Sequence, residues 1–180
     1  MTCVIGLSAG GKVYIGGDSA AASGWTRRVS GLPKVFRLGE FLIGYTDSFR
    51  MGQILQYHLL IRPQEENESD SEYMVNGFVE AVRACLKEYG FSKVDNNQEE
   101  GGAFLVGYRG KLYDFTSDFH VNCYSDDLAA VGCGAEYALG ALKVLERDKQ
   151  QPPEERIYIA LGIAAYFSMG VCAPFMVLEI

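Results

Sequence analysis

The sequence is poor in the residues that build metal sites, disulfide frameworks and histidine-based catalytic centres. It has two histidines, His58 and His120, and five widely spaced cysteines without a CxxC pair. Its five prolines are too few for a proline-rich linker. Lysine and arginine number 16 against 23 acidic residues, so the net charge is -7. This shortage of positive charge argues against a nucleic-acid-binding protein and against electrostatic attachment to anionic lipid.

The composition is that of a globular protein with one domain. Of the 180 residues, 48% are hydrophobic and 22% are charged, which excludes intrinsic disorder. The length predicts a single domain over residues 1–180. The odd number of cysteines and the lack of a signal-peptide pattern at the start favour the reducing cytoplasm. We expect no metal, no cofactor and no disulfide framework.

The spacing of apolar residues predicts strands and helices in separate groups. Residues 20–28 are predicted to be a loop or irregular strand, and residues 62–70 and 93–102 to be polar surface loops. Segregated strands and helices indicate an α+β layer fold rather than alternating βαβ units. The predicted strands are residues 3–8, 13–17, 35–38, 40–45, 103–108, 111–115, 128–131 and 171–178, and the predicted helices are residues 48–61, 71–90, 136–147 and 154–168.

The C-terminal part of the chain contains a long uncharged segment. Residues 157–178 carry no charged side chain, and a segment of this length could span ~30 Å of hydrocarbon. A membrane tail anchor is therefore one alternative. Gly162, Gly170 and Pro174 interrupt the segment, and no lysine or arginine follows it. We favour a buried helix followed by a strand.

Several polar residues and glycines invite functional interpretations, and each also has a simpler one. Asp18 ends a predicted strand, as an ordinary Asx turn does, and Lys34 could be an exposed lysine. Thr2 becomes N-terminal only if Met1 is removed. The glycines of residues 131–136 suggest a nucleotide loop or a methyltransferase motif, but Tyr137 stands where the fingerprint needs its third glycine. A tight strand-to-helix turn is the better interpretation of that segment.

Together these motifs resemble one family, the β subunits of proteasomes. The resemblance is greatest to the peptidase subunit of the bacterial two-component ATP-dependent protease, and it covers nearly the whole chain. It implies a four-layer αββα sandwich, the fold of N-terminal nucleophile hydrolases. The residues that carry it are TCVIG at 2–6, GDSA at 17–20, PKVFRL at 33–38, IGY at 43–45, AVGCG at 130–134 and YA at 137–138.

The resemblance also implies a role for each site residue. Thr2 would be the nucleophile, with its freed α-amine as the base, because such an amine has a pKa of about 7.7 to 8.0. Lys34 would place a positive charge beside the hydroxyl, and Asp18 would orient Lys34. The backbone N–H of Gly44 would donate to the oxyanion. The pocket for the residue before the cut would be apolar and would prefer apolar or aromatic side chains. Its lining would be Ala21, Leu32, Leu42 and Thr46.

The sequence departs from the family pattern at the edge of this site. Cys133 stands where a serine is usual, and a thiol is a weaker hydrogen-bonding group than a hydroxyl. Tyr166 and Met169 align with an acidic residue and a second serine. If Met1 stays attached, Thr2 has no free amine to act as base.

We therefore expect a threonine peptidase that acts on peptides or unfolded proteins inside a homo-oligomeric ring. The chain has no ATPase motif, so unfolding of substrates would need a separate ATPase partner. The apolar faces of the first two helices are expected to form interfaces between subunits. Two alternatives stay open, a non-catalytic structural subunit and a small-molecule amidase of the same fold. We expect no nucleic-acid or membrane partner.

Overall fold

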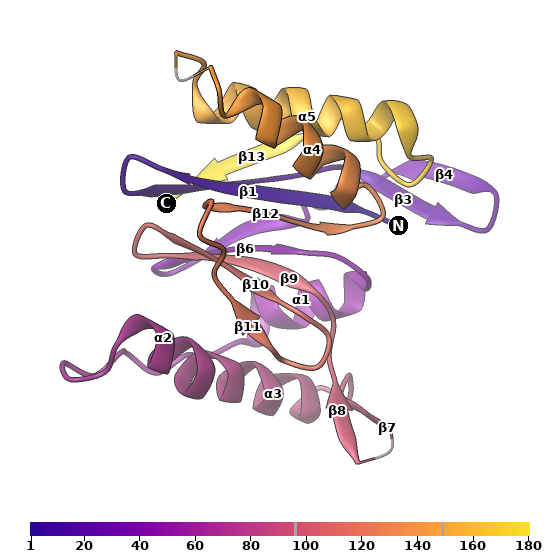
Figure 1. The fold of residues 1–180 in the computed structure, drawn as a ribbon. Helices are drawn as coiled ribbons and strands as arrows, with labels where there is room; N and C mark the ends of the chain where they lie inside the picture. The colour runs from indigo at the N-terminus through magenta and orange to yellow at the C-terminus, as the bar shows by residue number, and fades with distance from the viewer. Residues whose placement is uncertain (96, 149) are drawn as a thin grey trace.

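The structure, a computed structural model, describes residues 1–95, 97–148 and 150–180. Two β-sheets face each other in the middle, and helices cover the outer side of each sheet (Figure 1). The expected four-layer αββα arrangement is confirmed. Both termini belong to the upper sheet in the view of Figure 1.

The first sheet is antiparallel and has the strand order β12-β1-β2-β13. Its strands are β1 (Cys3–Ala9), β2 (Lys12–Gly17), β12 (Leu128–Gly132) and β13 (Met176–Glu179). The helices α4 (Ala135–Leu145) and α5 (Pro153–Phe167) cover its outer face. Pro153 suits the start of α5 because a helix needs no N–H donor at its first position.

The second sheet has the order β11-β10-β9-β6-β5. Its strands are β5 (Val35–Leu38), β6 (Phe41–Tyr45), β9 (Phe104–Tyr108), β10 (Lys111–Phe115) and β11 (Val121–Asn122). The helix α1 (Phe49–His58) and a longer helical run cover it. That run consists of α2 (Asp70–Glu72), the π-helical segment η1 (Tyr73–Phe78) and α3 (Val79–Glu88).

The core is divided by the two sheets. Between the sheets lies an aliphatic layer, whose side chains alternate with outward-facing ones along each strand. It includes Val4, Val13, Ile15, Val35, Leu42 and Leu105. The layer between the second sheet and its helices is rich in aromatic rings, such as Phe41 stacked on Tyr108. This layer also contains the apolar faces of α1 and α3.

The apolar faces of the first two helices were expected to form subunit interfaces, and this expectation is wrong. Their apolar residues Met51, Ile54, Phe78 and Val82 are completely buried against the second sheet of the same chain. An amphipathic helix must bury its apolar stripe somewhere, and here the chain's own sheet provides the surface.

Two segments form hairpins, one predicted to be a loop or irregular strand and the other a polar surface loop. Residues 20–28 belong to the hairpin of β3 (Ala20–Ser23) and β4 (Thr26–Val29). Part of residues 93–102 pairs as β7 (Lys93–Asp95) with β8 (Gln98–Glu100). Both hairpins are largely exposed, so the alternation of apolar and polar residues that marks a half-buried strand is missing from their sequences.

The uncharged segment 157–178 contains most of α5, an irregular connection and most of β13. Among the described residues, no helix has the length and apolar character that crossing a membrane requires. The tail-anchor alternative is therefore not supported.

Candidate active site

The buried pair of Asp18 and Lys34 forms the centre of the site. Asp18 directly follows β2, and Lys34 directly precedes β5 in the other sheet. Gly17 allows the approach, because a Cβ on it would lie 2.9 Å from Val35 Cγ2 and 3.6 Å from Lys34 Cβ. The Lys34 ammonium lies 2.8 Å from Asp18 Oδ1, and both side chains are almost completely buried. The sequence alone left Asp18 as a possible Asx turn and Lys34 as a possible exposed lysine.

Asp18 is held in place by four hydrogen bonds. Its Oδ1 accepts from Cys3 N at 2.9 Å and from Lys34 Nζ at 2.8 Å. Its Oδ2 accepts from Ala20 N at 2.7 Å and from Cys172 N at 3.2 Å. An ionised carboxylate can only accept hydrogen bonds, and here each oxygen has two donors. This arrangement stabilises a negative charge out of contact with water.

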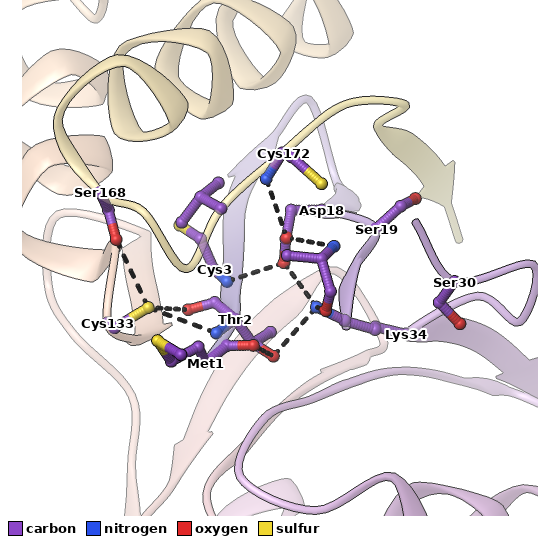
Figure 2. A network of polar contacts seen from close by, with 12 residues as sticks. Met1, Thr2, Cys3, Asp18, Ser19, Ser30, Lys34, Cys133, Ser168 and Cys172 are labelled. Atoms are coloured by element: carbon purple, nitrogen blue, oxygen red, sulfur yellow. Dashed lines mark hydrogen bonds and ion pairs between the residues drawn. The ribbon is translucent and has the colours of Figure 1, made fainter. Parts of the chain in front are cut away.

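The Lys34 ammonium uses its three N–H groups on three acceptors. Besides Asp18 it donates to Ala20 O at 2.8 Å and to Thr2 Oγ1 at 3.0 Å. The third bond directs a positive charge at the Thr2 hydroxyl, as Figure 2 shows. A cation at this distance favours negative charge on the oxygen, so it promotes the nucleophilic character of Thr2.

Thr2 is buried at the start of β1, and Met1 is still attached to it. Its hydroxyl donates to Met1 O at 2.6 Å. Its backbone N donates to Cys133 Sγ at 3.3 Å. In this form the Thr2 nitrogen is an amide and cannot accept a proton, so base catalysis by this nitrogen requires removal of Met1.

Cys133 connects the nucleophile to the last helix. It follows β12 and lies against Thr2 from the side opposite Lys34 (Figure 2). Its thiol donates to Thr2 O at 3.4 Å and accepts from Ser168 Oγ at 3.5 Å. The predicted proximity of Cys133 to Thr2 is therefore observed, while its contribution to catalysis stays a prediction.

Ser168 is a site residue that sequence reasoning missed. It caps the C-terminus of α5, and its hydroxyl contacts Cys133. The sequence alignment placed the second serine position at Met169 and the acidic position at Tyr166, but both side chains are largely exposed. The alignment of Met169 with the second serine position stays a prediction. A serine next to the aligned position was the available signal.

The Cys3 thiol is close to this network without being part of the chemistry. Burial, followed by the nearby Asp18 carboxylate, raises the pKa of Cys3 to about 12. The thiol therefore stays protonated at neutral pH, and a protonated thiol is a poor nucleophile.

The structure places the four predicted pocket residues differently. Thr46 is buried and borders a cavity of about 20 Å³ beside Thr2. Ala21 in β3 is half-buried and Leu32 is exposed, and their part in substrate binding stays a prediction. Leu42 is wrong as a lining residue, because its side chain is completely buried between the two sheets. Successive side chains of a strand point to opposite faces of the sheet, so an alignment that is off by one residue assigns a side chain to the wrong face.

Gly44 lies inside β6, opposite Val35 on one side and Leu105 on the other. The Tyr45 N–H donates to Lys34 O and the Thr46 N–H donates to Ala103 O. Because backbone groups alternate between the two neighbours of a strand, the Gly44 N–H faces β9. The oxyanion role of Gly44 stays a prediction without support from this register.

In the described parts of the chain, no group of three or more His, Cys, Asp or Glu side chains is arranged to hold a metal ion. The site consists of a hydroxyl, an ammonium, a carboxylate, a thiol and a second hydroxyl.

No protein-family model matches the sequence. Among solved structures, the chain is similar to BPH of Thiobacillus denitrificans in complex with epoxomicin, with a TM-score of 0.82 and 19% identity over 99% of this chain and 98% of that one. It is similar to eukaryotic HslV of Trypanosoma brucei, with a TM-score of 0.72 and 19% identity over 99% and 98% of the two chains. It is also similar to Anbu, the ancestral beta-subunit, of Yersinia bercovieri, with a TM-score of 0.67 and 14% identity over 99% and 81%. The chain therefore has the proteasome-like fold of the N-terminal nucleophile hydrolases.

Proposed function

We propose that the protein is an N-terminal threonine peptidase that becomes active when Met1 is removed. The observation that carries this proposal is the Lys34 ammonium, held by Asp18 and donating to the Thr2 hydroxyl at 3.0 Å. A buried ammonium directed at a single hydroxyl has an evident chemical use, which is to stabilise negative charge on that oxygen.

The first step of the reaction forms an ester with Thr2. The freed α-amine takes the hydroxyl proton while Thr2 Oγ1 attacks the carbonyl carbon of the substrate peptide bond. The tetrahedral intermediate then collapses, the carbon–nitrogen bond breaks, and the protonated amine of Thr2 gives its proton to the leaving nitrogen. Lys34 donates a hydrogen bond to Thr2 Oγ1 and stabilises negative charge on that oxygen.

The second step restores the enzyme. Water attacks the ester carbon, the Thr2 amine accepts a proton from the water, and the same proton returns to Thr2 Oγ1 as the ester bond breaks. The products are a carboxylic acid and a free hydroxyl. The whole cycle needs no histidine and no bound metal.

Removal of Met1 is required because the base of this mechanism is the Thr2 nitrogen. Threonine is small enough at the second position to permit removal of an initiator methionine. Once freed, the amine stays beside Cys133 Sγ, which contacts the same nitrogen at 3.3 Å in the present form. Cys133 can then orient the amine as the usual serine would, although with a weaker hydrogen bond.

Self-association is part of the proposal, and the outer surface of α4 and α5 supports it. α5 buries Ile157, Ala160, Leu161 and Ala164 on the first sheet, yet it also presents apolar residues to the outside. A helix that is apolar on both sides is normally covered on both. The exposed apolar side chains of the two helices are Tyr137, Leu139, Val144, Tyr158, Ile159, Ile163, Tyr166 and Phe167. We propose that like subunits cover this surface in a ring assembly, with a separate ATPase supplying unfolded substrate.

The test begins with intact mass, which establishes the fraction of chains that start at Thr2. Processed protein is then incubated with epoxomicin, whose epoxyketone captures an N-terminal threonine through both Oγ and the amine. We expect one adduct on Thr2 and hydrolysis of apolar peptides. Thr2→Ala should abolish both, Lys34→Met should lower kcat/KM about 10²–10³-fold, and the exposed Thr116→Ala should change neither. Absence of the adduct in fully processed protein would refute the threonine mechanism.

A non-catalytic structural subunit is the second candidate, favoured by Cys133 in place of a serine and by the exposed Tyr166 and Met169. Processed protein that assembles but forms no adduct would support this candidate. An amidase of the same fold would instead form the adduct, hydrolyse small amides in preference to peptides, and sediment as a small species. Native mass and the substrate comparison therefore separate the three.

A further inference from the structure

An apolar cleft of about 160 Å³ lies beside the N-terminus, outside the network of Figure 2. Its walls come from the end of the β3–β4 hairpin and from the turn after α5, and they include Met1, Ala22, Trp25, Arg27 and Met169. Trp25 is 97% exposed and Met169 is 75% exposed. A tryptophan left almost entirely in water is costly unless something covers it during function.

The walls of this cleft are fixed relative to the nucleophile. The hairpin begins at Ala20, which donates its N–H to Asp18 and accepts from Lys34. The Arg27 guanidinium donates to Met169 O and to Val171 O at 3.4 Å each, so it joins the hairpin to the turn after α5. The cleft is therefore attached to the same residues that hold the Thr2 hydroxyl in place.

A peptide residue bonded to the Thr2 nitrogen already occupies the mouth of the cleft. That residue is Met1, whose side chain is an apolar wall of the cleft. It lies over the bare backbone of Gly170, where an added Cβ would be 2.6 Å from Met1 Cβ. The space beside the Thr2 nitrogen thus accepts an unbranched apolar side chain. Removal of Met1 would vacate it.

The chemistry of the proposed peptidase decides which substrate residue comes there. The Thr2 amine must hand its proton to the leaving nitrogen, so that nitrogen has to approach within about 2.6–3.2 Å of it. The leaving nitrogen belongs to the residue that follows the scissile bond. That residue therefore binds close to the Thr2 nitrogen, where Met1 now lies.

We propose that the cleft between Trp25 and Met169 binds the side chain of the substrate residue immediately after the cut, and that it selects an apolar side chain of leucine or methionine size. The inference rests on the proposed peptidase function. The space that Met1 fills sets the size of the accepted side chain, and the Arg27 guanidinium at the wall repels lysine and arginine. The residue that follows the cut thus contributes to specificity together with the one that precedes it.

The test uses fully processed, assembled protein and three peptides that differ only in the residue after the cut, which is Leu, Ser or Lys. We expect kcat/KM to fall from Leu to Ser to Lys, with about a tenfold or larger preference for Leu over Ser, as usual for one apolar side chain in a pocket. Trp25→Ala and Met169→Ala should each reduce this ratio toward one. Tyr57→Ala, an exposed aromatic residue on α1, is the matched control and should leave the ratio unchanged.

The possible outcomes separate this inference from the proposed function. If Trp25→Ala leaves the Leu-to-Ser ratio of peptide hydrolysis unchanged, this result would refute the proposed role of the cleft but would agree with the proposed peptidase function. If Trp25→Ala loses the assembly while the remaining activity keeps the same Leu-to-Ser ratio, Trp25 forms a contact between copies of the chain. This result would also refute the proposed role of the cleft. Absence of both hydrolysis and the Thr2 adduct would refute the peptidase and the cleft together.

Discussion

Two ion pairs of this protein have the same length, but one is buried and the other is exposed. Comparing their loss measures how burial changes the contribution of an ion pair to the free energy of unfolding. Lys34 Nζ lies 2.8 Å from Asp18 Oδ1, with side-chain exposures of 1% and 0%. Lys12 Nζ lies 2.8 Å from Glu179 Oε1, with exposures of 54% and 36%. We predict that Asp18→Asn destabilises the protein strongly and that Glu179→Gln has little effect.

The expected magnitude follows from the partners of Asp18. Asparagine removes the counter-charge of a buried ammonium, and its NH₂ group replaces an oxygen that accepts two hydrogen bonds. Breaking one partner of a buried pair costs about 3–5 kcal/mol, because the other charge is left uncompensated. A domain has a total stability of about 5–15 kcal/mol, so this loss is a large part of it. The exposed pair is screened by water and its loss is small.

The assay is urea unfolding followed by far-ultraviolet circular dichroism, at one protein concentration so that assembly contributes equally. Lys34→Met should also destabilise, because it leaves the Asp18 carboxylate buried without its cation. The double variant should lose less than the sum of the two single losses, since it leaves neither charge alone. The reasoning is refuted if Asp18→Asn lowers the free energy of unfolding by less than about 1 kcal/mol.

Four further predictions concern single positions. Burial raises the pKa of Asp114, so its charge opposes folding at neutral pH. Asp114→Asn should raise Tm at pH 7 but hardly change it below about pH 3, where the carboxyl is protonated in both the folded and the unfolded state. Gly16→Ala would push a methyl group into Ile157 and should lower the free energy of unfolding by about 1–3 kcal/mol in a denaturant titration. Gly162→Ala, with open space around it on α5, should instead raise that free energy by up to ~1 kcal/mol. Iodoacetamide should block peptide hydrolysis by the wild type, and Cys133→Ser should prevent this inhibition.

The sequence predicts best those parts of the fold in which one face is buried. The hairpin of β1 and β2 and the helices α4 and α5 have clear apolar periodicity, and they lie within a few residues of their predicted positions. The β3–β4 hairpin was predicted only as a loop or irregular strand, because β4 is fully exposed and no alternation of apolar and polar residues marks either strand. β13 is shorter than predicted, since residues 171–175 continue the apolar pattern as a turn region and not as a strand.

The candidate site could be predicted only where a motif fixes a residue to the end of a strand. Asp18 and Lys34 lie at such ends, and the structure brings both to Thr2. Ser168 could not be placed because its contact with Cys133 depends on the position of the last turn of α5. Leu42 was misassigned because sequence spacing does not say which face of β6 turns inward.

The hydrogen bond from the Cys172 backbone to Asp18 joins residues 154 positions apart. A ribosome delivers the N-terminal end first, so Thr2, Asp18 and Lys34 emerge long before Cys172 and Ser168 do. During this interval the Asp18 carboxylate lacks one of its four donors, and the cysteine beside Thr2 lacks the serine that contacts it. Thr2, Asp18 and Lys34 are thus made early, whereas Ser168 and Cys172, which complete the hydrogen bonds around them, are among the last residues made. The hydrogen-bond network around Thr2 can therefore be completed only when almost the whole chain has been synthesised.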